Sequence, residues 1–191
     1  MFACKKNYFL IIDSIKNFDL RNIKKYNKFS IIYRNTNKEE KVSEIRKFRN
    51  NCKIKKIKFF IANNLNLMIS TNSDGIYISA SNKSYKSLNL NKTRFKIIGS
   101  AHNTKEINFK QKQGCSKILF SKLFLVDYDK NAPILGIVKF NKYYHYVSKK
   151  LVPLGGIKIS NLNTLKNLGA SSVAISSAIK KKPAKIFSRL F

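Results

Sequence analysis

Short runs of β-branched and aromatic residues alternate along the chain with amphipathic or polar stretches. A short apolar run between polar residues predicts a buried strand, and apolar residues three or four apart predict a helix face. The pattern predicts eight strands, at residues 8–12, 30–33, 57–61, 75–78, 95–99, 117–120, 151–156 and 172–175. Helical stretches are predicted at 20–26, 38–48, 65–70, 104–113, 138–148, 161–168 and 183–190, with a long loop or shortened helix at 79–93.

Strands and helices therefore follow one another in eight successive units. Repeated strand–helix units imply parallel strands joined by right-handed crossovers. Eight units predict an α/β fold of the (β/α)8 TIM-barrel type, with residues 1–191 as one domain. The chain is short beside the typical length of about 250 residues, so a doubly wound open sheet is the alternative. In a barrel, chemistry sits at the carboxyl ends of the strands.

Composition narrows the class of protein. Hydrophobic residues make up 43% of the chain and aromatic residues 12%, which excludes general disorder. The chain has no apolar run of about 18 residues, so we expect no membrane-spanning helix, and its start lacks the pattern of a signal peptide. Cys4, Cys52 and Cys115 are too far apart for a disulfide framework or a cysteine-rich zinc site. We expect a soluble cytoplasmic domain.

The charge is strongly positive, with 39 Lys and Arg against 9 Asp and Glu, a net charge of +30. Such a charge suggests a basic nucleic-acid-binding domain, but arginine is scarce and the lysines are spread from end to end among Asn and Ile. Nucleic acid is therefore the less favoured partner, and a basic face clustered away from the barrel mouth would be its structural sign. The electrostatic field of this positive charge would also attract a small anionic substrate.

Two segments near the end of the chain predict a phosphate site. Gly155 and Gly156 follow the seventh strand, and Ser176 and Ser177 follow the eighth. The loops after these two strands are a frequent phosphate site in barrels, and glycines let backbone N–H groups approach an anion. Each segment alone is explained equally well by a tight turn or a helix cap. Together they favour a phosphate site.

Three further residues at strand ends are candidates for chemistry. Arg34 ends the second strand and offers a planar fork to a phosphate or pyrophosphate, unless it is a surface residue at a frayed end. Ser100 and His102 follow the fifth strand. A histidine there is suited to transfer protons near neutral pH, or else it caps the next helix.

The carboxylates offer no obvious pair for a metal ion. Glu39, Glu40, Glu44 and Glu106 are predicted on helices facing water, which leaves only Asp13, Asp127 and Asp129 near strand ends. Magnesium usually takes one or two carboxylates together with phosphate oxygens.

Six strings in order resemble the thiamine-phosphate synthase family, which includes the thiazole tautomerases. The resemblance runs from about residue 30 to the carboxyl terminus, through residues 73–78, 98–103, 121–124, 132–136, 154–157 and 169–179. It implies a (β/α)8 barrel that joins a hydroxymethylpyrimidine pyrophosphate to a thiazole phosphate. In the family, magnesium and cationic residues hold the departing pyrophosphate.

The resemblance also assigns roles to individual residues. Arg34 falls on the family arginine, and Ser100 and His102 on the family serine and histidine. Asn63 and Asn82 fall on the two magnesium aspartates, so both carboxylates are amides in this chain. The positions that match the thiazole-phosphate site are Gly155, Gly156, Ser176 and Ser177.

The sequence thus predicts a thiamine-phosphate synthase-like transferase acting on small phosphorylated substrates, with Mg2+ as the cofactor that the family implies. Arg34, Ser100 and His102 are the predicted catalytic residues, and Asn63 joins the substrate-binding set. The alternatives are a thiazole tautomerase using His102 and a non-catalytic thiazole-phosphate binder.

Overall fold

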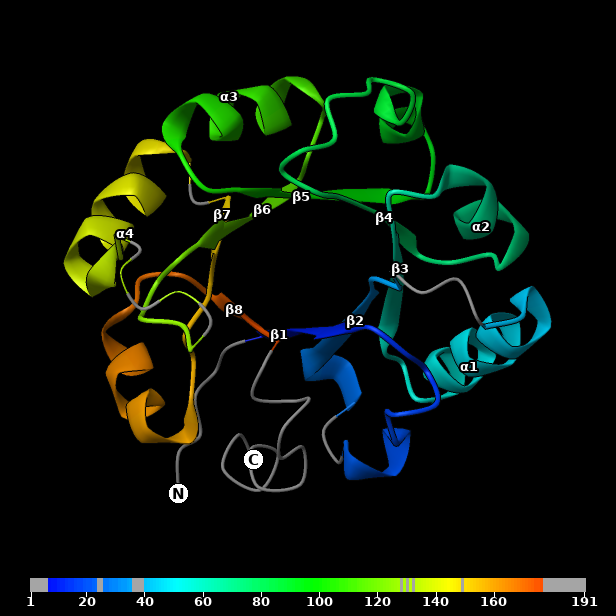
Figure 1. Ribbon diagram of the computed structural model, residues 1–191. Coiled ribbons are helices and arrows are strands. Elements are labelled where there is room, and N and C mark those ends of the chain that lie inside the picture. The colour runs from blue at the N-terminus through cyan, green and yellow to red at the C-terminus, as the bar shows by residue number, and fades with distance from the viewer. Residues whose placement is uncertain are drawn as a thin grey trace.

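The computed structural model describes residues 7–23, 26–35, 40–127, 129, 131, 133–148 and 150–176, the side chains of residues 26, 91 and 92 excepted. Figure 1 looks down a ring of strands with the helices arranged around its outside. The predicted helix at 183–190 lies outside the described residues.

Eight parallel strands form the ring: β1 (Asn7–Ile12), β2 (Phe29–Tyr33), β3 (Lys58–Ala62), β4 (Gly75–Ile78), β5 (Lys96–Ala101), β6 (Lys117–Ser121), β7 (Leu151–Leu154) and β8 (Ser172–Ile175). Their order is β7-β6-β5-β4-β3-β2-β1-β8, and β7 and β8 lie against each other at the seam. Because β7 and β8 stand at the two ends of this order and contact each other, the sheet curls into a barrel. The predicted (β/α)8 class is confirmed, and the open-sheet alternative is wrong.

The helices around the ring are α1 (Val42–Ile54), α2 (Leu65–Ser70), α3 (Thr104–Lys112) and α4 (Gly136–Tyr146). Asparagine side chains cap two of them: Asn64 accepts from the backbone N of Leu67, and Asn103 from that of Glu106, each at 2.9 Å. Elsewhere the connections tighten into 3-10 turns at Leu20–Asn22, Tyr26–Lys28, Leu88–Lys92, Ile159–Asn161 and Asn163–Asn167. The helices predicted at 20–26 and 161–168 are therefore wrong in type.

The interior of the barrel is a layer to which every strand contributes an apolar residue. Since side chains of a strand alternate between its two faces, residues two positions beyond this layer also face inward, at the carboxyl mouth. Residues two positions before it face inward at the amino mouth. The layer consists of Phe9, Ile11, Ile32, Phe60, Tyr77, Ile98, Leu119, Val152 and Ala174.

A second and larger apolar cluster lies between the strands and the helices. It holds the thiols of Cys52 and Cys115, both free and buried. Burial raises the pKa of each thiol to about 12, so both are inert at neutral pH. Within the part of the chain that the structure describes, no helix has the length and apolar character needed to cross a membrane.

Candidate active site

A cavity of about 610 Å3 opens at the carboxyl ends of the strands, where barrel folds carry their chemistry. Residues from the ends of β2, β4, β5, β6, β7 and β8 line it. Six of the predicted site residues are among them: Arg34, Ser100, His102, Gly155, Gly156 and Ser176. Ser177 lies outside the described residues.

Four serines form the inner wall of this cavity. Ser79, Ser100, Ser121 and Ser176 all line it, and each lies two positions after an apolar residue of the interior layer. The alternation of the strands therefore turns all four toward the barrel axis. The wall presents hydroxyl groups, which donate and accept hydrogen bonds without adding charge.

Arg34 is held at the end of β2, where its backbone N donates to the carbonyl oxygen of Ile12 at 2.8 Å. Its side chain reaches the hydroxyl of Tyr77. Burial raises the pKa of Tyr77, while hydrogen bonds to Ser100 and Arg34 and the charge of Arg34 oppose that rise. Arg34, Tyr77 and Ser100 thus meet on one side of the cavity.

His102 directly follows β5 in the chain and contacts residues of β6 and α3. Its ring Nδ1 lies 2.9 Å from the hydroxyl oxygen of Ser121, and its backbone N donates to Oε2 of Glu106 at 2.7 Å. Which of the two groups donates at Nδ1 depends on the tautomer of the ring. Glu106 lines the cavity, so the prediction that it simply faces water is wrong.

The backbone conformation after β7 requires glycine at both positions, in addition to any role of these residues toward phosphate. Gly155 and Gly156 have φ of +98° and +66°, a region that favours glycine. A Cβ on Gly156 would lie 2.4 Å from the carbonyl oxygen of Leu125 and 2.5 Å from that of Phe124. The segment that follows β6 therefore packs directly on this turn.

Asn63 and Asn82, at the family's magnesium positions, bond to each other. Asn63 Oδ1 accepts from Asn82 Nδ2 at 3.1 Å and from the backbone N of Ser79 at 2.9 Å. Asn82 Oδ1 accepts from the backbone N of Ser84 at 2.9 Å. Both amide oxygens are thus engaged by N–H donors, and neither residue lines the cavity.

This pair does not fit a magnesium ion, which prefers charged oxygen ligands. Asp127 and Asp129 are ion-paired with Lys158 and Lys122. Among the described residues, no group of three or more His, Cys, Asp and Glu side chains could hold a metal ion. Magnesium stays a prediction from the resemblance.

A buried group of polar side chains that the sequence analysis did not predict, here called the buried clamp, lies behind Asn82. Lys110 of α3 is fully buried, and its Nζ donates to the carbonyl oxygen of Asn82 at 2.7 Å and to Oε1 of Gln113 at 2.8 Å. Gln113 Nε2 donates to the carbonyl oxygen of Ser84 at 2.7 Å. Burial lowers the pKa of Lys110. The helical spacing of Lys110 from buried Ile107 is the signal that could have found it.

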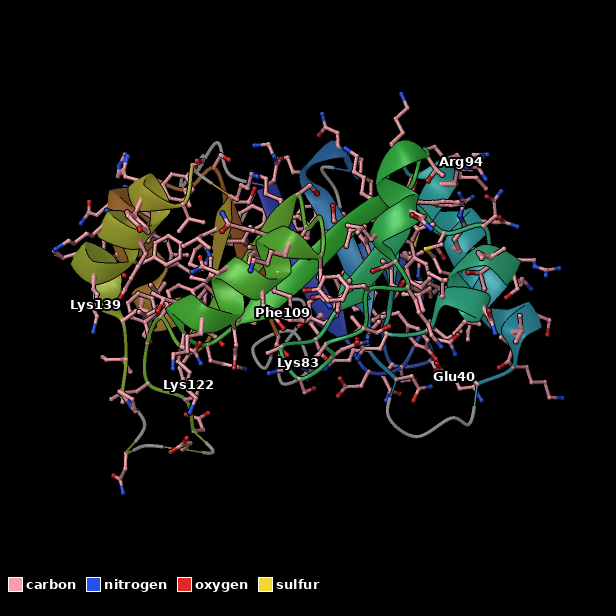
Figure 2. The ribbon with its side chains drawn as sticks, turned by 90° about the horizontal axis from the view of Figure 1, so that it is seen from above. Glu40, Lys83, Arg94, Phe109, Lys122 and Lys139 are labelled. Carbon is pink, nitrogen blue, oxygen red and sulfur yellow. The ribbon has the colours of Figure 1, made fainter. Side chains whose placement is uncertain are left out.

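An aromatic contact lies beside this clamp. Phe109 packs against Tyr85 with ring centroids 5.3 Å apart, and Nζ of Lys83 lies 5.7 Å from the centroid of Phe109. Figure 2 shows Lys83 and Phe109 as neighbours. The segment after β4, which supplies Ser79 and Ser81 to the cavity, is thereby fixed to α3.

Glu40, predicted to face water, instead organises the ends of β1 and β2. Its carboxylate accepts from Ser14 Oγ at 2.5 Å, from the backbone N of Ile15 at 2.9 Å, and from the hydroxyl of Tyr33. Burial alone would raise the pKa of Glu40, but these hydrogen bonds outweigh it and hold the pKa below its ordinary value. Burial, together with the bond to Glu40, raises the pKa of Tyr33.

The protein is thus a (β/α)8 barrel whose candidate active site is the cavity at the carboxyl ends of its strands. The family model described as "Thiamine monophosphate synthase" matches residues 20–179. The chain belongs to this thiamine-phosphate synthase family, and the resemblance seen in the sequence is confirmed.

Individual relatives agree with the family model. The chain is similar to thiamine-phosphate synthases of Prochlorococcus marinus, at 28% identity over 148 residues, and of Thermoplasma acidophilum, at 29% over 140 residues. These matches cover 77% and 72% of this chain but 42% and 65% of the respective relatives. The chain therefore spans less than two thirds of the length of each.

Solved structures show the same fold. The thiamine phosphate pyrophosphorylase of Pyrococcus furiosus superposes with a TM-score of 0.76 at 17% identity, over 98% of this chain and 95% of the other. The 3-hexulose-6-phosphate synthase of Salmonella typhimurium has a TM-score of 0.68 at 12% identity, over 96% of each chain.

Proposed function

We propose that this barrel binds a thiazole phosphate and joins it to a hydroxymethylpyrimidine pyrophosphate, giving thiamine phosphate and pyrophosphate. The observation that carries the proposal is the cavity at the carboxyl mouth, in a chain whose family match covers residues 20–179. Arg34 supplies this cavity with a cation, and four strands supply it with hydroxyls.

The reaction breaks the bond between the pyrimidine methylene carbon and the pyrophosphate oxygen, and the thiazole nitrogen then attacks that carbon. Negative charge gathers on the departing pyrophosphate. Arg34 and the hydroxyls of Tyr77 and Ser100, which meet on one side of the cavity, are the groups proposed to face it. Donors held in place before the reaction stabilise such charge most effectively. The turn at Gly155 and Gly156, together with Ser176, is proposed to face the thiazole phosphate.

No step in this scheme passes through magnesium, because the Asn63–Asn82 pair does not offer it a ligand set. Where magnesium enters with the pyrophosphate substrate, it would add positive charge at the same oxygens. The cytoplasmic location expected from the sequence also stays a prediction.

A second candidate function rests on the contact between His102 and Ser121. A thiazole tautomerase moves a proton between two positions of the thiazole phosphate, and a histidine held by a hydroxyl within the cavity is suited to that transfer. This reaction needs no pyrophosphate.

Two measurements test the proposal. Calorimetric titration of thiazole phosphate, with and without pyrophosphate and Mg2+, tests binding, and a turnover assay with both substrates tests synthesis. Arg34→Met should abolish turnover, because the departing pyrophosphate loses its cation. Arg94→Met is the matched control, since Arg94 precedes β5 at the amino ends of the strands and does not line the cavity; Figure 2 labels this residue.

The outcomes separate the candidates. Thiamine phosphate formed by the wild type and lost in Arg34→Met supports the synthase. Tautomerised thiazole phosphate without condensation favours the second function, and failure to bind thiazole phosphate would overturn both.

A further inference from the structure

A second cavity, of about 290 Å3, lies at the opposite, amino mouth of the barrel. This volume is near the lower end of the range for small-ligand pockets, about 300 Å3. Phe9, Phe60 and Ile98 of the interior layer form its floor. Its other lining residues include five lysines, Lys28, Lys56, Lys58, Lys96 and Lys117.

Three of these lysines are turned into the barrel by the register of their strands. Lys58, Lys96 and Lys117 stand two positions before Phe60, Ile98 and Leu119 of the interior layer. Side chains two apart share a face of a strand. β3, β5 and β6 therefore each direct one ammonium group toward the same opening.

Gly75 is the residue of β4 that faces the amino mouth between Lys58 and Lys96, and it presents no side chain there. A Cβ there would lie 1.9 Å from the carbonyl oxygen of Lys96, so no side chain can separate the two lysines. Burial, and then the charge of Lys96, lower the pKa of Lys58. The two ammonium groups thus act on each other electrostatically.

None of the described residues that line this cavity is a carboxylate. Asp74 is an acid close enough to act on Lys58, and its Oδ2 already accepts from the backbone N of Phe59 at 2.9 Å. Ser30 and Ser172 add hydroxyl donors to the lining. The cavity therefore gathers positive charge and donors without a matching acid in its described lining.

We propose that the amino mouth of this barrel is a binding site for a small multivalent oxyanion of the pyrophosphate or phosphate-ester class. Lys58, Lys96 and Lys117 are its ligands, and Ser30 and Ser172 supply further donors. The site lies at the other end of the strands from the candidate active site, so it does not depend on the proposed function.

The shape of the site favours a small anion over a nucleic acid. The three lysines gather around one opening above an apolar floor, with Lys58 and Lys96 exposed to solvent at its rim, whereas a nucleic-acid backbone needs cations spread along an extended surface. A compact anion reaches all three ammonium groups at once and relieves their mutual repulsion.

The experiment titrates inorganic pyrophosphate by calorimetry into Arg34→Met, a background that removes the cation of the candidate active site. In this background Lys58→Gln with Lys96→Gln should weaken pyrophosphate binding by at least about tenfold, because two charged donors are lost. Lys139→Gln with Lys142→Gln, both exposed on α4 and outside the lining of either cavity, removes the same charge elsewhere on the molecule; Figure 2 labels Lys139. This control pair should change the affinity by less than about twofold.

Thermal unfolding without pyrophosphate provides a second readout. The Lys58→Gln, Lys96→Gln protein should melt at a higher temperature than its parent at low salt, since repulsion at the mouth is removed, and pyrophosphate should no longer raise its Tm. If that double variant fails to fold, Lys117→Gln replaces it, with the same expected loss of affinity.

Three results would overturn the proposal. Equal weakening by the two lysine pairs would mean that a diffuse field binds the anion. Unchanged affinity in the Lys58, Lys96 variant would mean that pyrophosphate binds elsewhere. Binding of duplex DNA that depends on these lysines, without binding of pyrophosphate, would assign the surface to nucleic acid.

Discussion

The hydroxyl oxygen of Ser121 lies 2.9 Å from Nδ1 of His102, which joins the end of β6 to the turn after β5. The hydroxyl fixes the orientation of the imidazole ring within the cavity wall. Ser121 is thus a positioning residue for His102.

The first prediction removes this hydroxyl. In Ser121→Ala we expect the proton transfer by His102, the step of the tautomerase candidate, to slow by about tenfold, because the ring loses the group that orients it. The loss should appear in kcat with little change in KM, and Ser121→Thr, which keeps a hydroxyl, should retain most of the activity. Ser70→Ala, on the surface of α2, is the control. An equal loss in Ser121→Ala and Ser121→Thr would show that the contact has only a structural role.

The second prediction restores the carboxylates at the family's magnesium positions. Asn63→Asp with Asn82→Asp places two negative charges where two amides now bond to each other. The double variant should lose stability without a divalent cation and regain it as Mg2+ is added. Its Tm should therefore depend on Mg2+, and that of the wild type should not. A wild-type Tm that rises equally with Mg2+ would contradict this reading of the amide pair.

The third prediction concerns the carboxylate of Glu40. Its pKa is lower in the folded protein than its ordinary value of 4.5. The stability it contributes is therefore complete above that value and is lost as the pH falls through the folded-state pKa. Glu40→Gln should lower the free energy of unfolding by about 1–2 kcal/mol at pH 7.

The measurement is urea unfolding of wild type and Glu40→Gln at several pH values. The difference between the two proteins should shrink below about pH 4. Glu44→Gln, in the first turn of α1, is the control. A difference independent of pH would indicate that shape, rather than charge, matters at position 40.

The fourth prediction breaks the buried clamp. Lys110→Met keeps most of the side-chain volume but leaves Oε1 of Gln113 without the donor it has now. A buried acceptor that loses its donor costs about 1–3 kcal/mol. Lys112→Met, exposed on the same helix, should cost less than about 0.5 kcal/mol.

A double-mutant cycle checks the cause. Adding Gln113→Leu to Lys110→Met removes both partners, so the combined loss of unfolding free energy should be smaller than the sum of the two single losses. Additive losses would mean that Lys110 acts through packing alone.

Hydrophobic patterning predicted the strands because it reports directly on burial. The strands at 75–78 and 172–175 match β4 and β8 in the structure, and the others differ by a few residues at their ends. The segment predicted as a helix at 161–168 forms 3-10 turns instead. It contacts a part of the chain distant in sequence, because Asn141 Nδ2 donates to the carbonyl oxygen of Asn167 at 2.8 Å, and a local pattern does not report such a contact.

The polar contacts of the site were harder to predict than its location. The rule that barrels place chemistry after their strands was enough to select Arg34, Ser100 and His102, all of which line the cavity. The roles of Glu40 and Lys110 depend on partners 25 and 28 positions away. The spacing of Lys110 from Ile107 could have indicated that Lys110 is buried, but no local pattern identifies the partners of Lys110 or of Glu40, so both resembled ordinary surface charges.

The layered interior of the barrel also limits which insertions and deletions its strands can accept. β3, β5 and β6 each carry a lysine, then an apolar residue, then an alanine or serine at steps of two, from one mouth to the other. Inserting or deleting a single codon within one of these strands would turn the side chains on one side of the change outward against the helices, while those on the other side would still face inward. A change of two codons would keep the inward face but move a residue from one layer to the next. Length variation in this lineage should therefore collect in the connections and leave the strands at constant length.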